Sequence, residues 1–291
     1  MTLTGLSVTL VRACLRAGAG GSPTAVVDEA GLSDGERRRV PVESGTSHAV
    51  FLAADPAGRE GAGGSPSVSL RFFTAEGELP ACGHGTVAAL AVLAARAGST
   101  RHRFELRTHD RSFTGRWVRE GGRGTAAFDP GPVNLREPAA DEAESVADAL
   151  KLAPTPTGSG PVIASVGRPR LLVPVASRAA LAALAPDLDR LRAACDRWGL
   201  LGAYVHSPPD AEGRLAARMF APSIGVPEDI ANANSTACLA AHLAGRGRTR
   251  IAVDMGDALG SPATITATAT GPVPRVLVGG AAELTGTRTL S

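Results

Sequence analysis

Short hydrophobic runs, bounded by clusters of glycine, proline and serine, recur along the whole chain. Runs of this length between turn residues are typical of β-strands. In the first half they predict strands at 6–11, 25–27, 49–53, 68–73, 104–107, 113–118 and 125–128. In the second half they predict strands at 162–165, 171–175, 202–206, 216–220, 251–253, 263–268 and 275–279. Helical periodicity predicts helices at 87–98, 177–184, 187–199 and 235–244.

A proline-rich, acidic stretch at 129–144 interrupts this pattern and predicts a linker between two domains. The expected domains are 1–128 and 145–274, and the final segment 275–291 could return to the first domain. The chain's 291 residues are enough for two domains of ordinary size.

The two halves resemble each other at one place. Residues 71–74, the polar turn 83–86 and an apolar helix are echoed by 218–221, the turn 232–235 and a second apolar helix. Both helices are rich in alanine and leucine on nearly every face, so we expect each to be buried inside its own sheet. The repeat predicts a pseudo-twofold architecture with a cleft between the domains. Helix starts that face this cleft would offer backbone N–H groups to an anion. In the alternative reading, Gly83 and Asn232 or Asn234 simply cap their helices.

Composition narrows the function classes. Lys and Arg number 30 against 28 Asp and Glu, and aromatic residues make up only 3%. This balance argues against nucleic acid as a partner. The four cysteines form no CxxC pair, so we expect neither a structural zinc site nor a disulfide framework. With neither a signal-like start nor a membrane-length apolar run, the sequence predicts a cytoplasmic protein that does not bind a membrane.

Several segments, in chain order, resemble the PhzF-like family of phenazine biosynthesis proteins. The segment 21–27 (GSPTAVV) is similar to the family's G-N-P-x-A-V, and 47–52 (SHAVFL) falls where members have S-E-x-x-F-V. The most specific match is 73–86 (FTAEGELPACGHGT), which resembles F-T-P-x-x-E-L-P-x-C-G-H-A-T. Segments 166–173 and 220–239 match the second half of the family pattern.

This resemblance implies an α+β protein with the diaminopimelate epimerase fold: two similar domains, each a sheet wrapped around a central helix, with the active site between them. It also implies cofactor-independent proton transfer on a small carboxylated substrate. By position, His84 and Asp229 match the active-site polar residues. The residues that match the substrate-binding turns are Cys82, Gly83, His84, Ala233, Asn234 and Ser235.

The main departure from the family pattern is His48, which stands where members have a proton-shuttling glutamate. An imidazole has an ordinary pKa of about 6.5 and can accept and return a proton near neutral pH. Two readings therefore stay open: His48 has taken over proton transfer, or the protein is a non-catalytic carboxylate binder. The second turn also departs from the usual T-G-S, reading Asn-Ala-Asn at 232–234.

We therefore expect a cofactor-independent, metal-free isomerase that moves a proton, and with it a double bond, in a small unsaturated amino or imino acid or cyclic carboxylate. In this reading His48 is the general base and acid, and His84 and Asp229 orient the substrate or relay the proton. Some family members act in antibiotic and other specialised biosynthesis, and many are homodimers, so both are expectations here. An alternative is an amino-acid epimerase or racemase using His48 with Cys82. A second cysteine is missing at the other turn, because Cys238 lies well inside the predicted helix.

Overall fold

The structure is a computed structural model that describes residues 3–29, 31–54, 67–98, 100–152, 160–271 and 275–290. The chain divides into two compact units. Unit 1 comprises Met1–Asp129 and Gly279–Ser291, and unit 2 comprises Pro130–Val278. Each unit is described by itself.

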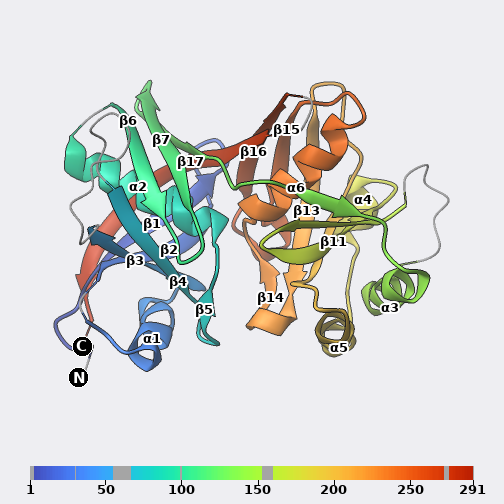
Figure 1. The fold of residues 1–291 in the computed structure, drawn as a ribbon, viewed down its shortest axis with the longest axis horizontal. Coiled ribbons are helices and arrows are strands. Elements are labelled where there is room, and N and C mark those ends of the chain that lie inside the picture. The colour runs from blue at the N-terminus through green and yellow to red at the C-terminus, as the bar shows by residue number, and fades with distance from the viewer. Residues whose placement is uncertain are drawn as a thin grey trace. The chain divides into compact units, whose positions relative to one another are not determined.

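Unit 1 is a sheet closed around one helix (Figure 1). Its strands pair in the order β1 (Ser7–Leu15), β2 (Ser22–Asp28), β3 (His48–Ala54), β4 (Ser67–Phe73), β6 (Arg101–Arg107), β7 (Ser112–Glu120) and β8 (Arg123–Phe128). The pairs β2–β3 and β4–β6 are parallel and the others are antiparallel. The long strand β17 (Arg275–Thr289) pairs with both β1 and β8 and so closes the sheet.

The helix inside this sheet, α2 (Gly83–Ala97), contacts β1, β2, β3, β7 and β8. Every residue from Gly83 to Val92 is buried, which confirms the expectation of a helix without a solvent face. The helix α1 (Asp34–Ser44) lies outside the sheet, where Val40 packs with Phe51 and Phe73. The patterns above did not predict α1, because Pro41 interrupts it and its polar residues outnumber the apolar ones.

Unit 2 repeats this plan with a second buried helix (Figure 1). Its strands pair in the order β9 (Asn134–Arg136), β10 (Val162–Val166), β11 (Arg168–Pro174), β12 (Ala203–His206), β13 (Arg214–Ala221), β15 (Arg250–Met255) and β16 (Ala263–Thr270). The helix α6 (Ala233–Ala244) contacts β10, β11, β15 and β16, and its residues from Ala233 to Leu243 are buried. The helices α3 (Ala140–Leu150), α4 (Arg178–Ala182) and α5 (Leu188–Trp198) contribute to a second apolar core with Leu171 and Val205.

The internal repeat predicted from the sequence is present in the topology. In unit 1, β4 pairs with the short strand β5 (Glu78–Leu79), α2 follows, and β6 then runs parallel to β4. In unit 2, β13 pairs with β14 (Val226–Asp229), α6 follows, and β15 runs parallel to β13. Each buried helix therefore begins shortly after a short strand, and the predicted substrate-binding residues of the two turns lie at these helix starts.

The division between the two units falls between Asp129 and Pro130, at the start of the predicted linker, but the segment 129–144 is itself structured. It contains β9, paired with β10, and the start of α3. One of its acidic residues serves the local structure: Glu142 in the first turn of α3 accepts a hydrogen bond from the backbone N–H of Ala139 and pairs with Arg136. Composition alone does not distinguish a linker from an edge strand followed by a helix start.

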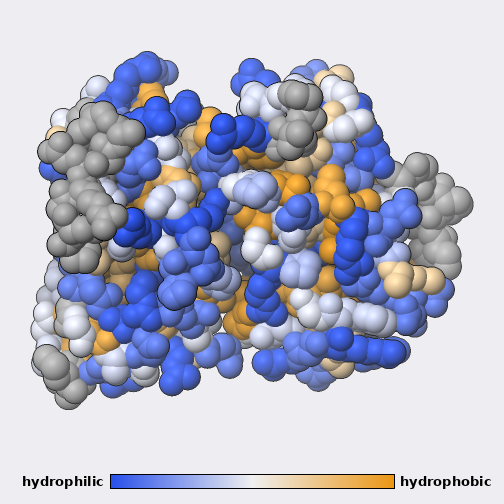
Figure 2. Space-filling view, in the orientation of Figure 1, coloured by the Kyte–Doolittle hydropathy of each residue, from blue (hydrophilic) through white to orange (hydrophobic). Residues whose placement is uncertain are grey.

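Hydrophobic side chains are concentrated in these cores. Hydrophilic residues cover much of the face seen in Figure 2, with apolar residues between them. The exposed large hydrophobic residues among those described are Val42, Leu135, Leu259 and Leu284. None of the helices in the described ranges has both the length and the hydropathy of a membrane-spanning segment.

Unit 2 buries an imidazole that should make its stability depend on pH. His206 at the end of β12 is 6% exposed, and burial lowers its pKa to about 4. In the unfolded chain the pKa returns to about 6.5. Between about pH 6.5 and pH 4 the unfolded state therefore binds more protons than the folded state, and the free energy of unfolding falls as the pH drops through this range. Relative to a His206→Gln variant, the wild type should lose roughly 2–3 kcal/mol of unfolding free energy between about pH 7 and pH 4. Urea unfolding of both proteins measures this loss, and parallel pH profiles would contradict it.

Candidate active site

The first predicted site residue, His48, begins strand β3 in unit 1. Its parallel register with Thr24 of β2 fixes the backbone at this point. The side chain is buried, and its Nδ1 lies 2.8 Å from the hydroxyl of Ser47. Burial, reinforced by the neighbouring His84, lowers the pKa of His48 well below its ordinary value. The ring is therefore neutral at pH 7 and carries a lone pair.

The second group of predicted residues lies at the start of α2. Cys82 is the N-cap residue but gives no side-chain cap. Its carbonyl accepts hydrogen bonds from the backbone N–H of Thr86, at 2.9 Å, and from the Thr86 hydroxyl, at 2.8 Å. This double contact anchors the first turn and holds Cys82, Gly83 and His84 in place.

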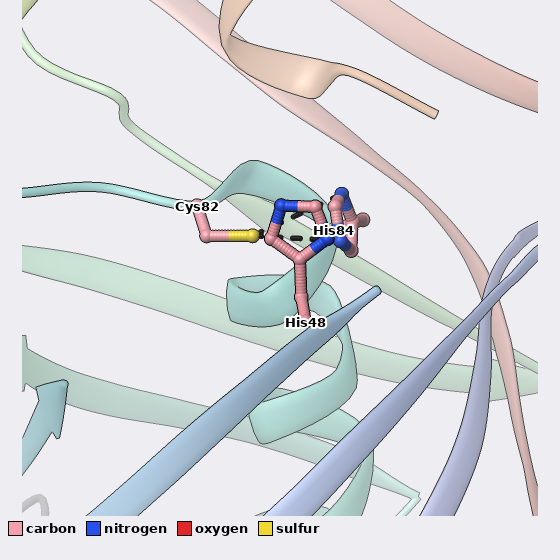
Figure 3. A group of neighbouring side chains, drawn as sticks. All are labelled: His48, Cys82 and His84. Carbon is pink, nitrogen blue, oxygen red and sulfur yellow. Dashed lines mark hydrogen bonds between the residues drawn. The ribbon is translucent and has the colours of Figure 1, made fainter. Parts of the chain in front are cut away.

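These two places in the chain meet in one buried cluster of three side chains, His48, Cys82 and His84 (Figure 3). The Cys82 sulfur lies 3.5 Å from Nε2 and 3.8 Å from Nδ1 of His84. The rings of His48 and His84 meet edge to face, with centroids 4.4 Å apart. Nitrogen and sulfur donor atoms of the three residues all lie within 4.8 Å of one another. We call these three residues the His–Cys–His cluster.

Gly85 makes room for this cluster. A Cβ atom at this position would lie 3.0 Å from the Cys82 sulfur and 3.0 Å from Cδ1 of Phe72. Contacts this short would require the sulfur or the phenylalanine ring to move. The glycine therefore lets the thiol lie directly over the first turn of α2, beside His84.

The predicted residues of unit 2 lie around the start of α6. Asp229 ends β14, is buried, and accepts a 3.0 Å hydrogen bond from the Asn232 side-chain amide. Asn232 caps α6, because its side-chain oxygen accepts a 2.9 Å hydrogen bond from the backbone N–H of Ser235. The capping alternative thus holds for Asn232, whereas α2 has no side-chain cap.

The hydrogen bonds of this turn distinguish Ser235 from the other two predicted substrate ligands, Ala233 and Asn234. Ser235 is fully buried, its N–H is bound to Asn232, and its hydroxyl donates to the Met219 sulfur at 3.6 Å. Both polar groups are engaged within unit 2, so the geometry does not favour Ser235 as a substrate ligand. Ala233 and Asn234 begin α6 and are also buried. Their predicted role in binding a carboxylate stays a prediction.

Glu228, next to Asp229, has a structural role. Its carboxylate receives two hydrogen bonds from the Arg218 guanidinium, at 2.9 and 2.7 Å, and both side chains are largely buried. Arg218 also donates to the carbonyl oxygens of Leu181 and Leu184. This network ties β14 to β13 and to the chain around α4, and it fixes the position from which Asp229 extends.

The sequence did not reveal the His–Cys–His cluster as a unit. The spacing of Cys82 and His84 within one motif was a signal for that pair. His48 lies 34 positions before Cys82 in the chain and joins them only through the packing of β3 against α2. Arg170 was also missed: it is 1% exposed, and its guanidinium donates to the Cys238 sulfur at 2.9 Å. Cys238 is thereby part of the interior of unit 2.

Comparisons with known proteins agree with this architecture. A family model described as phenazine biosynthesis-like protein matches residues 14–287. The uncharacterized isomerase YddE of Escherichia coli (strain K12) is 28% identical over 237 residues, covering 77% of this chain and 74% of that protein. An uncharacterized isomerase of Deinococcus radiodurans is 32% identical over 213 residues, covering 67% of each chain.

Solved structures extend the similarity to the fold. The structure of a predicted epimerase from Pseudomonas aeruginosa has a TM-score of 0.82 at 26% identity, covering 98% of this chain and 99% of that one. A PhzF-family protein from Bacillus anthracis has a TM-score of 0.81 at 18% identity, covering 97% and 98%. A hydroxyproline epimerase from Agrobacterium vitis has a TM-score of 0.62 at 11% identity, covering 97% and 91%. The predicted α+β fold of the diaminopimelate epimerase type is confirmed.

The Arg218–Glu228 pair gives a stability prediction. Glu228→Gln leaves the guanidinium without its charged partner in a largely buried position, so the unfolding free energy should fall by about 2–4 kcal/mol. Glu212→Gln, an exposed change in the same unit, should leave it within about 0.5 kcal/mol. Denaturant unfolding of both variants measures the difference. Equal stabilities would show that the pair does not hold β14 in place.

Proposed function

The chain belongs to the phenazine biosynthesis-like family, and on this premise we propose that it is an isomerase that shifts a proton in a small unsaturated amino or imino acid or cyclic carboxylate. The curated relatives carry the name isomerase, which supports the reaction class. The observation that carries the finer proposal is the buried, neutral imidazole of His48 next to Cys82 and His84.

Proton migration along a conjugated acid needs a base to remove a proton and an acid to return it at another carbon. Neutral His48 can do both in turn. In the tautomer whose Nδ1–H donates to the Ser47 hydroxyl, Nε2 carries the lone pair and acts as the base, and after abstraction the imidazolium is the acid. A glutamate in the same buried position would need a raised pKa to return the proton.

The remaining roles are part of the proposal. We assign to His84 the stabilisation of the substrate's developing negative charge or the relay of the proton, and its contacts with His48 and Cys82 support this assignment. Gly83 and His84, and separately Ala233 and Asn234, offer backbone donors at helix starts to a carboxylate. Asp229 orients an amine or ring nitrogen of the substrate. Action in specialised biosynthesis and a homodimeric state also stay predictions.

The distances within the cluster favour a shift on one face of the substrate over two-base epimerisation by His48 and Cys82. Two bases on opposite faces of an α-carbon, each about 3–3.5 Å from it, would lie roughly 6–7 Å apart. The donor atoms of His48 and Cys82 lie within 4.8 Å of each other. Both groups therefore reach a reacting carbon from the same side.

The role of His48 is tested by proton NMR in D₂O on a panel of small unsaturated cyclic carboxylates. Wild-type protein should incorporate deuterium or shift a double bond, and His48→Gln should reduce the rate by about 10²–10⁴-fold while keeping ligand binding. His102→Gln, a change on β6 outside the cluster, is the matched control and should retain the wild-type rate. A full rate with His48→Gln would remove this residue from the mechanism. Binding without exchange across the panel would favour the non-catalytic carboxylate binder.

The one-face geometry makes a stereochemical prediction. With an active substrate that keeps a stereogenic α-carbon, deuterium should enter without inversion, as chiral chromatography of the product would show. Inversion at the α-carbon that is lost in both His48→Gln and Cys82→Ser would instead support the epimerase alternative.

A further inference from the structure

The His–Cys–His cluster has the composition of a transition-metal site. Two imidazoles and one thiol are donor types that suit Zn²⁺. All three side chains are buried, and their donor atoms lie within 4.8 Å of one another. The spacing of the cysteines does not predict such a site, because they form no CxxC pair. The expectation of a metal-free protein and the geometry of this cluster therefore point in different directions.

The distances are close to those that zinc requires. With Zn–S near 2.3 Å and Zn–N near 2.0–2.1 Å, neighbouring donors of a tetrahedral site lie about 3.3–3.7 Å apart. The Cys82 sulfur is 3.5 Å from Nε2 of His84, which already matches such an edge. The largest separation in the cluster exceeds an edge by about 1 Å, which a small rotation of an imidazole can supply.

The surroundings orient these donors in advance. Ser47 holds Nδ1 of His48, and such a contact fixes the ring of a metal-ligating histidine while its other nitrogen binds the ion. Gly85 leaves the space in which the Cys82 sulfur lies beside His84. The ligands stand on a strand start and on the first turn of a buried helix, as Figure 3 shows, so little order has to be gained on binding.

We propose that His48, Cys82 and His84 form a three-ligand Zn²⁺ site whose occupation switches off proton transfer. On binding, Cys82 releases its thiol proton to solvent and coordinates as the thiolate. His48 coordinates through Nε2, the atom that acts as the base in the proposed function. A metal-bound lone pair cannot accept a proton, so the ion and the catalytic proton compete for the same atom. This inhibitory effect, but not metal binding itself, rests on the proposed function.

Metal binding is tested on the full-length protein, treated with EDTA and dialysed, without any substrate. Zn²⁺ is titrated in competition with a chromophoric chelator, and Co²⁺ is the spectroscopic probe of sulfur ligation. We expect a single site with a thiolate-to-cobalt charge-transfer band. Loss of a second-shell partner commonly weakens metal binding by 10–100-fold, so removing a ligand in Cys82→Ser or His84→Gln should weaken Zn²⁺ binding by about 100-fold or more.

Matched controls change the same residue types outside the cluster. Cys195→Ala and His206→Gln, both in unit 2, should bind Zn²⁺ as the wild type does. Circular dichroism and thermal unfolding establish that each variant is folded. Two different ligand variants are used so that the test stands even when one of them does not fold. No charge-transfer band in the wild type, or unchanged Zn²⁺ affinity in folded Cys82→Ser and His84→Gln, would overturn the site.

Inhibition is measured separately, with a substrate found active in the D₂O assay. Stoichiometric Zn²⁺ should abolish exchange and EDTA should restore it; tight binding with unchanged turnover would overturn the inhibitory role. Zinc binding at the cluster without turnover of any substrate would contradict the proposed function and leave the metal site standing. Turnover in a protein that binds no zinc would support the proposed function and overturn the metal site.

Discussion

The enclosure of a helix that has no polar face is the constraint on which each unit depends. Burying α2 on all sides is favourable only if strands cover it completely, and the pairing of β17 with both β1 and β8 achieves this closure. An enclosed helix cannot satisfy its first N–H groups with water from the side. The start of α2 is therefore a polar site in an otherwise apolar interior, and the side chains of the His–Cys–His cluster lie there.

The fold was largely predictable because its signals are local. Runs bounded by glycine and proline marked most strands, and the helices α2 and α6 were evident from alanine and leucine on every face. The elements that were missed lack such signals. Helix α1 carries an internal Pro41, and β5 and β14 are too short to show alternation. The segment 129–144 has the composition of a linker but forms β9 and the start of α3.

The residues of the candidate site could be named from the sequence, but their arrangement could not. The motif around Cys82 and His84 and the position of His48 were visible in the sequence. Their meeting depends on the parallel register that aligns His48 with Thr24, on the packing of α2 against β3, and on the missing side chain at Gly85. Such long-range effects leave no periodicity. Likewise, no periodicity marks the cap that Asn232 makes to the Ser235 N–H, which engages this donor within unit 2.

The presence of histidine where the family pattern has glutamate has two linked consequences. Burial disfavours the charged form of either group, so a buried imidazole is held in its neutral, proton-accepting form, whereas a buried carboxyl group is held in its protonated form. The same substitution replaces a hard oxygen donor with a nitrogen, next to a thiol and a second imidazole. In the proposed function His48 acts through the lone pair of a buried, neutral imidazole, and the same lone pair is a donor in the proposed zinc site. On these two proposals, the histidine that serves as the proton shuttle also makes the site susceptible to metal, which a glutamate at this position would reduce.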